Sequence, residues 1–179
     1  MQFEFARLLG EEAAGEWELA SAGVVVPGPR HACATVRAMF DGDEILSEGV
    51  AAHRSRQLAA ELLDGYALVI AASRDERAAV ARLQPAMRDR TFTLREAIAL
   101  AQEPLTPAQD VEEVAEQLNT RRGLGMLPVA RKRRLLARPH PLDIPDTHIA
   151  GAVRHASALA AVRKHVHTLH GRITAALPD

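Results

Sequence analysis

The feature that most restricts the fold is "YALVIAAS" at residues 66–73, a continuous apolar run that becomes polar only at its end. Such a run is typical of a strand buried on both faces of a parallel sheet, because helices cover both sides of that kind of sheet. The segment "RDERAAVARLQP" follows directly, and it predicts a helix that stops at Pro85. A buried strand that leads straight into a helix indicates an α/β fold with a parallel sheet.

The rest of the chain alternates in the same way. Short strands are predicted at 17–22 and 90–94, a loop at 24–30 because two prolines flank a glycine there, and a turn in "DGDE". Helical patterns cover residues 3–14, 31–40, 53–65, 95–102 and 149–171, the last expected to end at Gly171. In such folds ligands bind at the carboxyl ends of the strands.

Residues 106–142 have the pattern of an insertion. We expect a helix at 106–123, with Thr106 as its cap and Pro107 at its first helical position. A polar stretch with the run "RKRR" follows. This run is of the kind that binds phosphates or nucleic acid, but in a net-neutral domain we favour a solvated loop.

Composition narrows the class of protein. The 179 residues suit one domain, 1–179, and a hydrophobic content of 47% predicts a packed globule. The net charge of −1 gives no electrostatic reason to expect nucleic acid or an acidic membrane surface as a partner. One cysteine excludes an intramolecular disulfide, and no apolar run reaches the roughly 18 residues of a membrane span. With no signal peptide evident, we expect a cytoplasmic protein.

The order of several short motifs resembles the low-molecular-weight protein tyrosine phosphatase family, in its bacterial, actinobacterial form with a long insertion. These motifs are "SAG" at 21–23, "HRSRQL" at 53–58, "YALVIAASRDERAAV" at 66–80, "RTFTLREA" at 90–97 and "DIPDTH" at 143–148. Each is short, but their order and spacing cover nearly the whole chain. The resemblance implies hydrolysis of a phosphate monoester or phosphotyrosine protein through a cysteinyl-phosphate, without a cofactor.

The resemblance also implies a flavodoxin-like αβα fold, with four parallel strands in the order 2-1-3-4. Met1 matches a position just after the family's Cys-x5-Arg-Ser-Pro loop, so the first strand, the nucleophilic cysteine and the phosphate-binding arginine have no counterparts here. We therefore expect the chain as written to be inactive, either as a truncated phosphatase or as a non-catalytic binding or regulatory protein. The missing strand would lie between 17–22 and 66–73. Either these two strands pair directly, or a second copy or another chain completes the sheet, or the chain folds poorly on its own; we favour a second copy or a partner chain, because exposed sheet edges invite pairing.

One catalytic part of the family does have a counterpart. Asp146, in "DIPDTH", matches the general acid that protonates the leaving phenolate. In the family this aspartate is followed by proline and by aromatic residues that form a wall beside the substrate. Here Thr147 and His148 take these positions, so the resemblance implies a different substrate wall. The alternative for Asp146 is a cap of the last helix.

Two residues match the family's support of the phosphate loop. Ser21 and His53 fall where the family places hydrogen bonds that brace this loop. The alternative is a turn serine and a helix-capping or surface histidine.

The single cysteine is not expected to replace the nucleophile. Cys33 is predicted in the middle of a helix, on its apolar side, where a thiol is inert. The histidines of the last helix, such as His167 and His170, are three residues apart, but no carboxylate or cysteine stands at ligand spacing, so we expect a solvated face and no metal.

Overall fold

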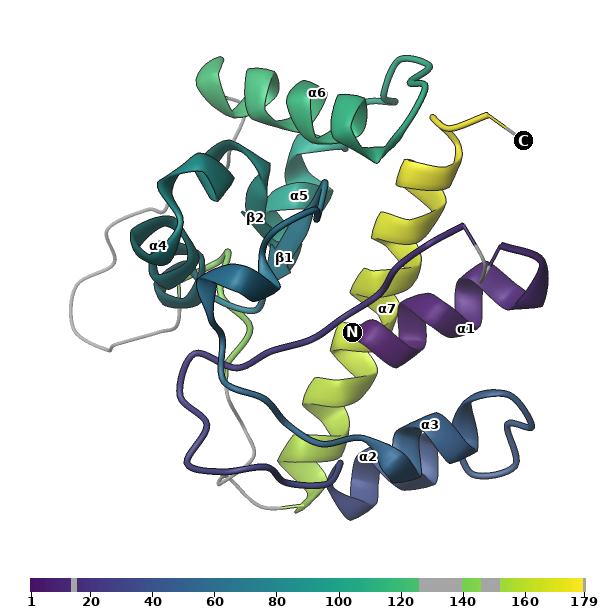
Figure 1. Cartoon of the computed structure of the whole chain (residues 1–179). Coiled ribbons are helices and arrows are strands. Elements are labelled where there is room, and N and C mark those ends of the chain that lie inside the picture. Colours follow the sequence, from purple (N-terminus) through teal and green to yellow (C-terminus); the bar gives the residue numbers. More distant parts are fainter. Residues whose placement is uncertain (14–15, 126–139, 146–151, 179) are drawn as a thin grey trace. The chain divides into compact units, whose positions relative to one another are not determined.

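The computed structural model describes residues 1–13, 16–125, 140–145 and 152–178. Contacts group the chain into two compact units: Met1–Ala59 with Thr147–His167, and Ala60–Asp146 with Thr168–Asp179. We call them the first and the second unit. The helix α7 (Ala152–Thr174) contributes its beginning to the first unit and its end to the second (Figure 1).

The second unit holds a two-stranded parallel sheet. Strand β1 (Val69–Ala71) pairs with β2 (Thr91–Thr93) (Figure 1). In this pairing Ile70 lies opposite Phe92. Between them run helix α4 (Arg74–Leu83) and the 3-10 helix η2 (Pro85–Arg90). This confirms an α/β fold with a parallel sheet, and both strands are shorter than the predicted 66–73 and 90–94. The order 2-1-3-4 stays a prediction.

The helices around the sheet begin and end as their sequences indicate. Helix α4 ends at Leu83, just before Pro85, as predicted, and helix α5 (Leu94–Leu100) follows β2 directly. The largest fully buried side chains of this unit come from β2, α5, α6 and the end of α7: Phe92, Leu94, Leu100, Leu118, Leu169 and Ile173.

Helix α6 (Val111–Gly123) corrects the prediction for the insertion. Its cap is Asp110, whose side chain accepts a hydrogen bond from the backbone N–H of Glu113, so the helix begins five residues after Thr106. The backbone N–H of Thr106 instead donates to the side chain of Gln117, a tertiary contact that fixes this stretch as a loop.

The first unit contains three further helices. They are α1 (Gln2–Ala13), which is interrupted at Gly10 with φ of 72°, α2 (Ala34–Met39) and α3 (Leu46–Ala52). Helix α3 was not predicted. Asp43, predicted only as part of a turn, accepts from the backbone N–H groups of Ile45 and Leu46, which lie at the start of this helix.

The predicted strand at 17–22 is wrong. The carbonyls of Leu19 and Ser21 accept hydrogen bonds from the side chains of Gln2 and Arg56, so side chains take the place of a neighbouring strand. The expectation of a partner chain between 17–22 and β1 loses its premise, because only β1 of these two segments is a strand.

The predicted helix at 53–65 is wrong as well. Only η1 (Ala60–Leu62) is helical there. The backbone of the preceding residues pairs with the loop at 23–31, through bonds such as Ser55 N–H to the carbonyl of Arg30 at 2.8 Å. Hydrogen bonds between the backbones of these two segments have thus outweighed the helical pattern of the sequence at 53–65.

Helix α7 passes through Gly171, the predicted end, and stops at Thr174. Ile173, beyond the glycine, is 1% exposed, and its burial outweighs the roughly 1 kcal/mol that glycine costs inside a helix. Across the described residues, no helix combines the length and apolar character that crossing a membrane requires.

Candidate functional site

The carboxyl ends of β1 and β2 form the candidate site of the second unit. The strands end at Ala71 and Thr93, and helices α4 and α5 begin at Arg74 and Leu94. This is the edge at which parallel α/β sheets bind ligands, because free backbone N–H groups and helix dipoles favour an anion there.

Both helix starts are capping boxes. At α4, Ser73 Oγ accepts from the N–H of Glu76, while Glu76 Oε2 accepts from the N–H groups of Ala72 and Ser73, each at 2.9 Å. At α5, the same exchange joins Thr93 and Glu96. The protein's own carboxylates thus occupy the donors that an anionic ligand would need.

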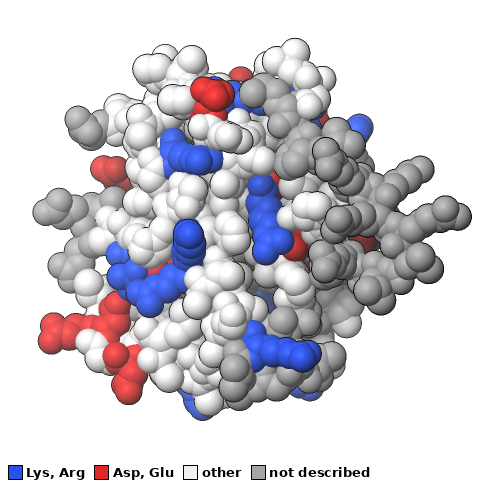
Figure 2. Space-filling view, turned by 180° about the vertical axis from the view of Figure 1, so that it is seen from behind, with Lys and Arg blue, Asp and Glu red and all other residues white. Residues whose placement is uncertain are grey.

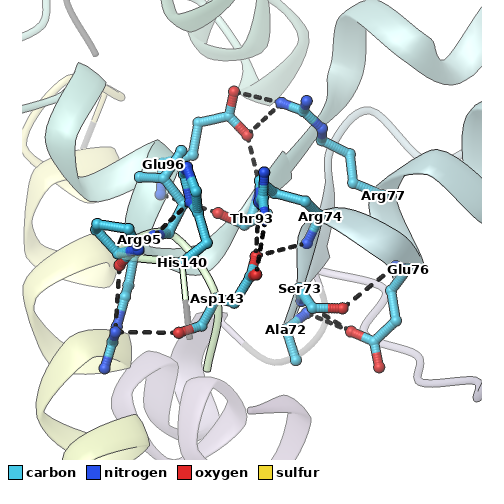
Figure 3. Close-up of polar contacts among 12 residues, drawn as sticks. Ala72, Ser73, Arg74, Glu76, Arg77, Thr93, Arg95, Glu96, His140 and Asp143 are labelled. Carbon is cyan, nitrogen blue, oxygen red and sulfur yellow. Dashed lines mark hydrogen bonds and ion pairs between the residues drawn. The ribbon is translucent and has the colours of Figure 1, made fainter. Parts of the chain in front are cut away.

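The segment at 140–145 contributes a third carboxylate to this site, that of Asp143. Asp143 Oδ1 accepts from the backbone N–H of Arg74 at 2.9 Å and from its Nε at 3.2 Å, and Oδ2 accepts from its Nη2 at 3.3 Å (Figure 3). The N–H of Ile144 donates to the carbonyl of Ala72 at 2.9 Å. The beginning of "DIPDTH" is therefore bound to the carboxyl end of β1.

Arg95 holds the same segment from α5. Its Nη1 donates to the carbonyls of Pro141 at 3.2 Å and Asp143 at 3.0 Å. Leu142, between them, is 7% exposed. One buried apolar side chain and two arginines thus fix the backbone of residues 141–144.

The environment of Asp143 favours its charged form. Burial by itself would raise the pKa of this carboxyl, but the hydrogen bonds from the side chain and backbone of Arg74, with the charges of Arg74 and His140, lower it below its ordinary value. Asp143 is an ionised acceptor, which suits a structural role and not proton donation.

Glu96 is the most buried charge of the site. Its side chain is fully buried, and Arg77 Nη1 donates to its two oxygens at 2.5 and 2.7 Å. Arg122 Nε lies 3.5 Å from the same carboxylate, and its guanidinium stacks over the Phe92 ring at 4.2 Å. The pair of arginines compensates the buried charge and ties α4 and α6 to α5.

Three of the predicted site residues, Asp146, Thr147 and His148, lie outside the described residues. The other two lie in the first unit. Ser21 is exposed and its hydroxyl donates to Gln2 Oε1 at 2.6 Å, while His53 packs edge-on against the Phe3 ring at 5.5 Å. Among the described contacts no hydrogen bond joins Ser21 to His53.

Cys33 stands in another place than predicted. It is the residue before α2, not inside a helix, and it is half-buried. Its Sγ lies 3.4 Å from His155 Nε2. The thiol is therefore less enclosed than the predicted core position.

The histidines of α7 do not gather as ligands in the described part of the chain. His167 Nε2 lies 2.6 Å from Glu4 Oε1, which Arg7 and Arg163 also contact. Across the described ranges no group of three or more His, Cys, Asp and Glu residues could hold a metal ion. The run "RKRR" lies outside these ranges.

Charge is dispersed on the face drawn in Figure 2. There, basic side chains of the described residues are separated by uncharged ones and do not merge into one basic surface. Several arginines of the second unit donate to backbone carbonyls, as Arg121 does to those of Leu100, Glu103 and Pro104.

The sequence held signals for this site that the pattern analysis missed. "SRDE" at 73–76 and "TLRE" at 93–96 both follow the capping-box rule, Ser or Thr followed three residues later by Glu. Asp143 had no such local signal, because its partner Arg74 is far away in the chain.

No protein-family model, curated protein or solved structure gives a significant match to this chain.

Proposed function

We propose that this chain is a low-molecular-weight protein tyrosine phosphatase-like protein with a flavodoxin-like fold. One observation supports this more than any other: the segment that begins "DIPDTH" is bound at the carboxyl end of β1, through Asp143 and Ile144. A general-acid loop has to lie at this edge of a parallel sheet, since the reacting phosphate of such a fold binds there.

The proposed roles follow the resemblance. Asp146 is the acid that protonates the leaving phenolate, Thr147 and His148 form the wall beside the substrate, and Ser21 and His53 support the phosphate loop. The substrate is a phosphorylated protein or another phosphate monoester, and the setting is the bacterial cytoplasm.

The nucleophile is the part that the written sequence does not supply. The family reaction needs a thiolate that attacks phosphorus and an arginine six residues later that binds the phosphoryl oxygens. The sixth residue after Cys33 is Met39, and the amides at the starts of α4 and α5 are occupied by Glu76, Glu96 and Asp143. We therefore expect no turnover by this chain alone.

The direct test is hydrolysis of para-nitrophenyl phosphate by the purified chain and by Cys33→Ser. The expected rate equals the background for both proteins. Turnover that disappears in Cys33→Ser would make Cys33 the nucleophile and contradict the expectation that this chain alone is inactive.

The second candidate is a non-catalytic, phosphatase-like binding protein. It is favoured by Thr147, which stands where the family's acid loop has proline. The DNA upstream of Met1 separates the two. An in-frame strand followed by Cys-x5-Arg-Ser-Pro supports the enzyme, and a coding sequence without it supports the binding protein.

A further inference from the structure

Two loops of the first unit are joined along their backbones. The N–H of Gly23 donates to the carbonyl of Arg56 at 2.9 Å, that of Leu58 to Gly23 at 2.8 Å, and that of Ser55 to Arg30 at 2.8 Å. Residues 23–31 and 53–58 thus form one continuous piece of surface. Ser55 strengthens the join, because its Oγ accepts from the N–H of Arg30 at 2.9 Å.

This joined surface carries only basic charge. Residues 19–40 and 49–60 contain no Asp or Glu. Within the two paired loops stand Arg30, His31, Arg54 and Arg56, all of them exposed, and we call these four the basic strip. The chain as a whole has a net charge of −1, so this accumulation is local.

The charges of the basic strip are held in place but not neutralised. Arg54 Nη1 donates to the carbonyls of Ala52 and His53, and lies 2.7 Å from His31 Nδ1. Arg56 Nε donates to the carbonyl of Ser21 at 2.9 Å. Each ion pair of the described residues involves other cations, and none includes a member of the strip.

The charge of the basic strip affects the pKa of the neighbouring His53. Burial lowers the pKa of His53, and the positive charges of Arg54 and Arg56 lower it further. This direction is expected when nearby guanidinium groups lack an acidic partner.

We infer that the basic strip is a docking surface for a short acidic peptide segment of a partner protein. Guanidinium groups bind carboxylates and phosphorylated side chains through paired, charge-assisted hydrogen bonds, and clusters of them are a common way to recognise acidic motifs. Arginines already oriented by backbone carbonyls lose less conformational freedom on binding. The surface binds its partner whether or not the chain takes part in phosphate hydrolysis.

A peptide suits this surface better than a nucleic acid. The two joined loops carry no Phe, Tyr or Trp on which bases could stack, and recognition of single strands depends on such stacking. The net charge of the chain also gives no long-range attraction to a polyanion.

The experiment measures binding of fluorescein-labelled hexaglutamate to the full chain by anisotropy at low salt. Hexalysine and an oligothymidylate are the comparison probes. Arg30→Gln is the main variant, because no side-chain hydrogen bond of Arg30 is present in the described structure and the fold should be kept. Arg82→Gln is the matched control, since Arg82 is exposed on α4 and loses the same charge.

Hexaglutamate should bind, and Arg30→Gln should weaken it roughly fivefold, the worth of one exposed ion pair of good geometry. Combining it with Arg56→Gln should weaken binding further, while Arg82→Gln should not. Absence of hexaglutamate binding, or equal weakening by Arg82→Gln, would overturn the inference. Tighter binding of the oligothymidylate, lost in Arg30→Gln, would assign the strip to nucleic acid. None of these readouts uses phosphate hydrolysis, so the phosphatase proposal stands or falls separately.

Discussion

The carboxylate of Glu96 is fully buried and receives the guanidinium of Arg77, whose Nη1 lies 2.5 Å from one carboxylate oxygen and 2.7 Å from the other. Glu96 belongs to the helix after β2 and Arg77 to the helix after β1. The pair therefore joins the two helices that start at the same edge of the sheet. Its second partner, Arg122 on α6, brings the predicted insertion into the same contact.

Removing the charge of Glu96 should be costly. Glu96→Gln leaves two guanidinium groups facing a neutral amide, and breaking a buried pair costs about 3 kcal/mol. The free energy of unfolding in urea measures this loss. Glu112→Gln is the control, because Glu112 also pairs with an arginine, Arg90, but both side chains are partly open to solvent, and the expected loss is under about 1 kcal/mol. Equal losses in the two variants would contradict the role given to Glu96.

Asp143 should make stability depend on acid pH. Its pKa is lowered in the folded chain, so its contribution is complete above the ordinary carboxyl pKa and is lost as pH falls through the lower, folded value. Urea midpoints should be flat from neutral pH to about pH 5 and fall below about pH 4. Asp143→Asn should lower the free energy of unfolding at neutral pH by about 1 kcal/mol. The decrease of the urea midpoint at acid pH should also be smaller in this variant. An unchanged acid fall in Asp143→Asn would show that other carboxylates cause it.

Glu4 should hold α1 against α7 within the first unit. It is 4% exposed, and Arg7, Arg163 and His167 all contact its Oε1. Glu4→Gln leaves the guanidinium groups of Arg7 and Arg163 without their anionic partner, and we expect a loss of about 2 kcal/mol. Glu48→Gln on α3 is the exposed control. Thermal unfolding followed by circular dichroism measures both, and a stable Glu4→Gln protein would count against this role.

A longer form of the protein would test Asp146. If upstream DNA encodes the cysteine loop, Asp146→Asn in that form should slow release of a poor leaving group by roughly 10²–10⁴-fold, the usual effect of a positioned general acid. A good leaving group such as para-nitrophenolate should suffer less. Small, equal effects on both substrates would leave Asp146 as a helix cap.

The predictions that hold are those that rest on residues adjacent in the sequence. The apolar run before "SRDE" predicted a buried parallel strand and a helix, and β1 and α4 lie there, because burial on both faces and capping are written into adjacent residues. Pro85 likewise stops α4 where its missing N–H predicts. The sequence by itself therefore determined the α/β class, the parallel sheet and the helices that follow its strands.

Only the tertiary structure decided where distant segments pair. Residues 17–22 have a strand-like pattern but are bound by the side chains of Gln2 and Arg56, and residues 53–58 have a helical pattern but pair with the loop at 23–31. Asp143 binds Arg74 across a long separation in the chain, which no local periodicity encodes. The physical reason is that a backbone or charged group takes whichever partner folding brings to it, and local propensities of a few tenths of a kcal/mol per residue do not outweigh a hydrogen bond of about 1 kcal/mol.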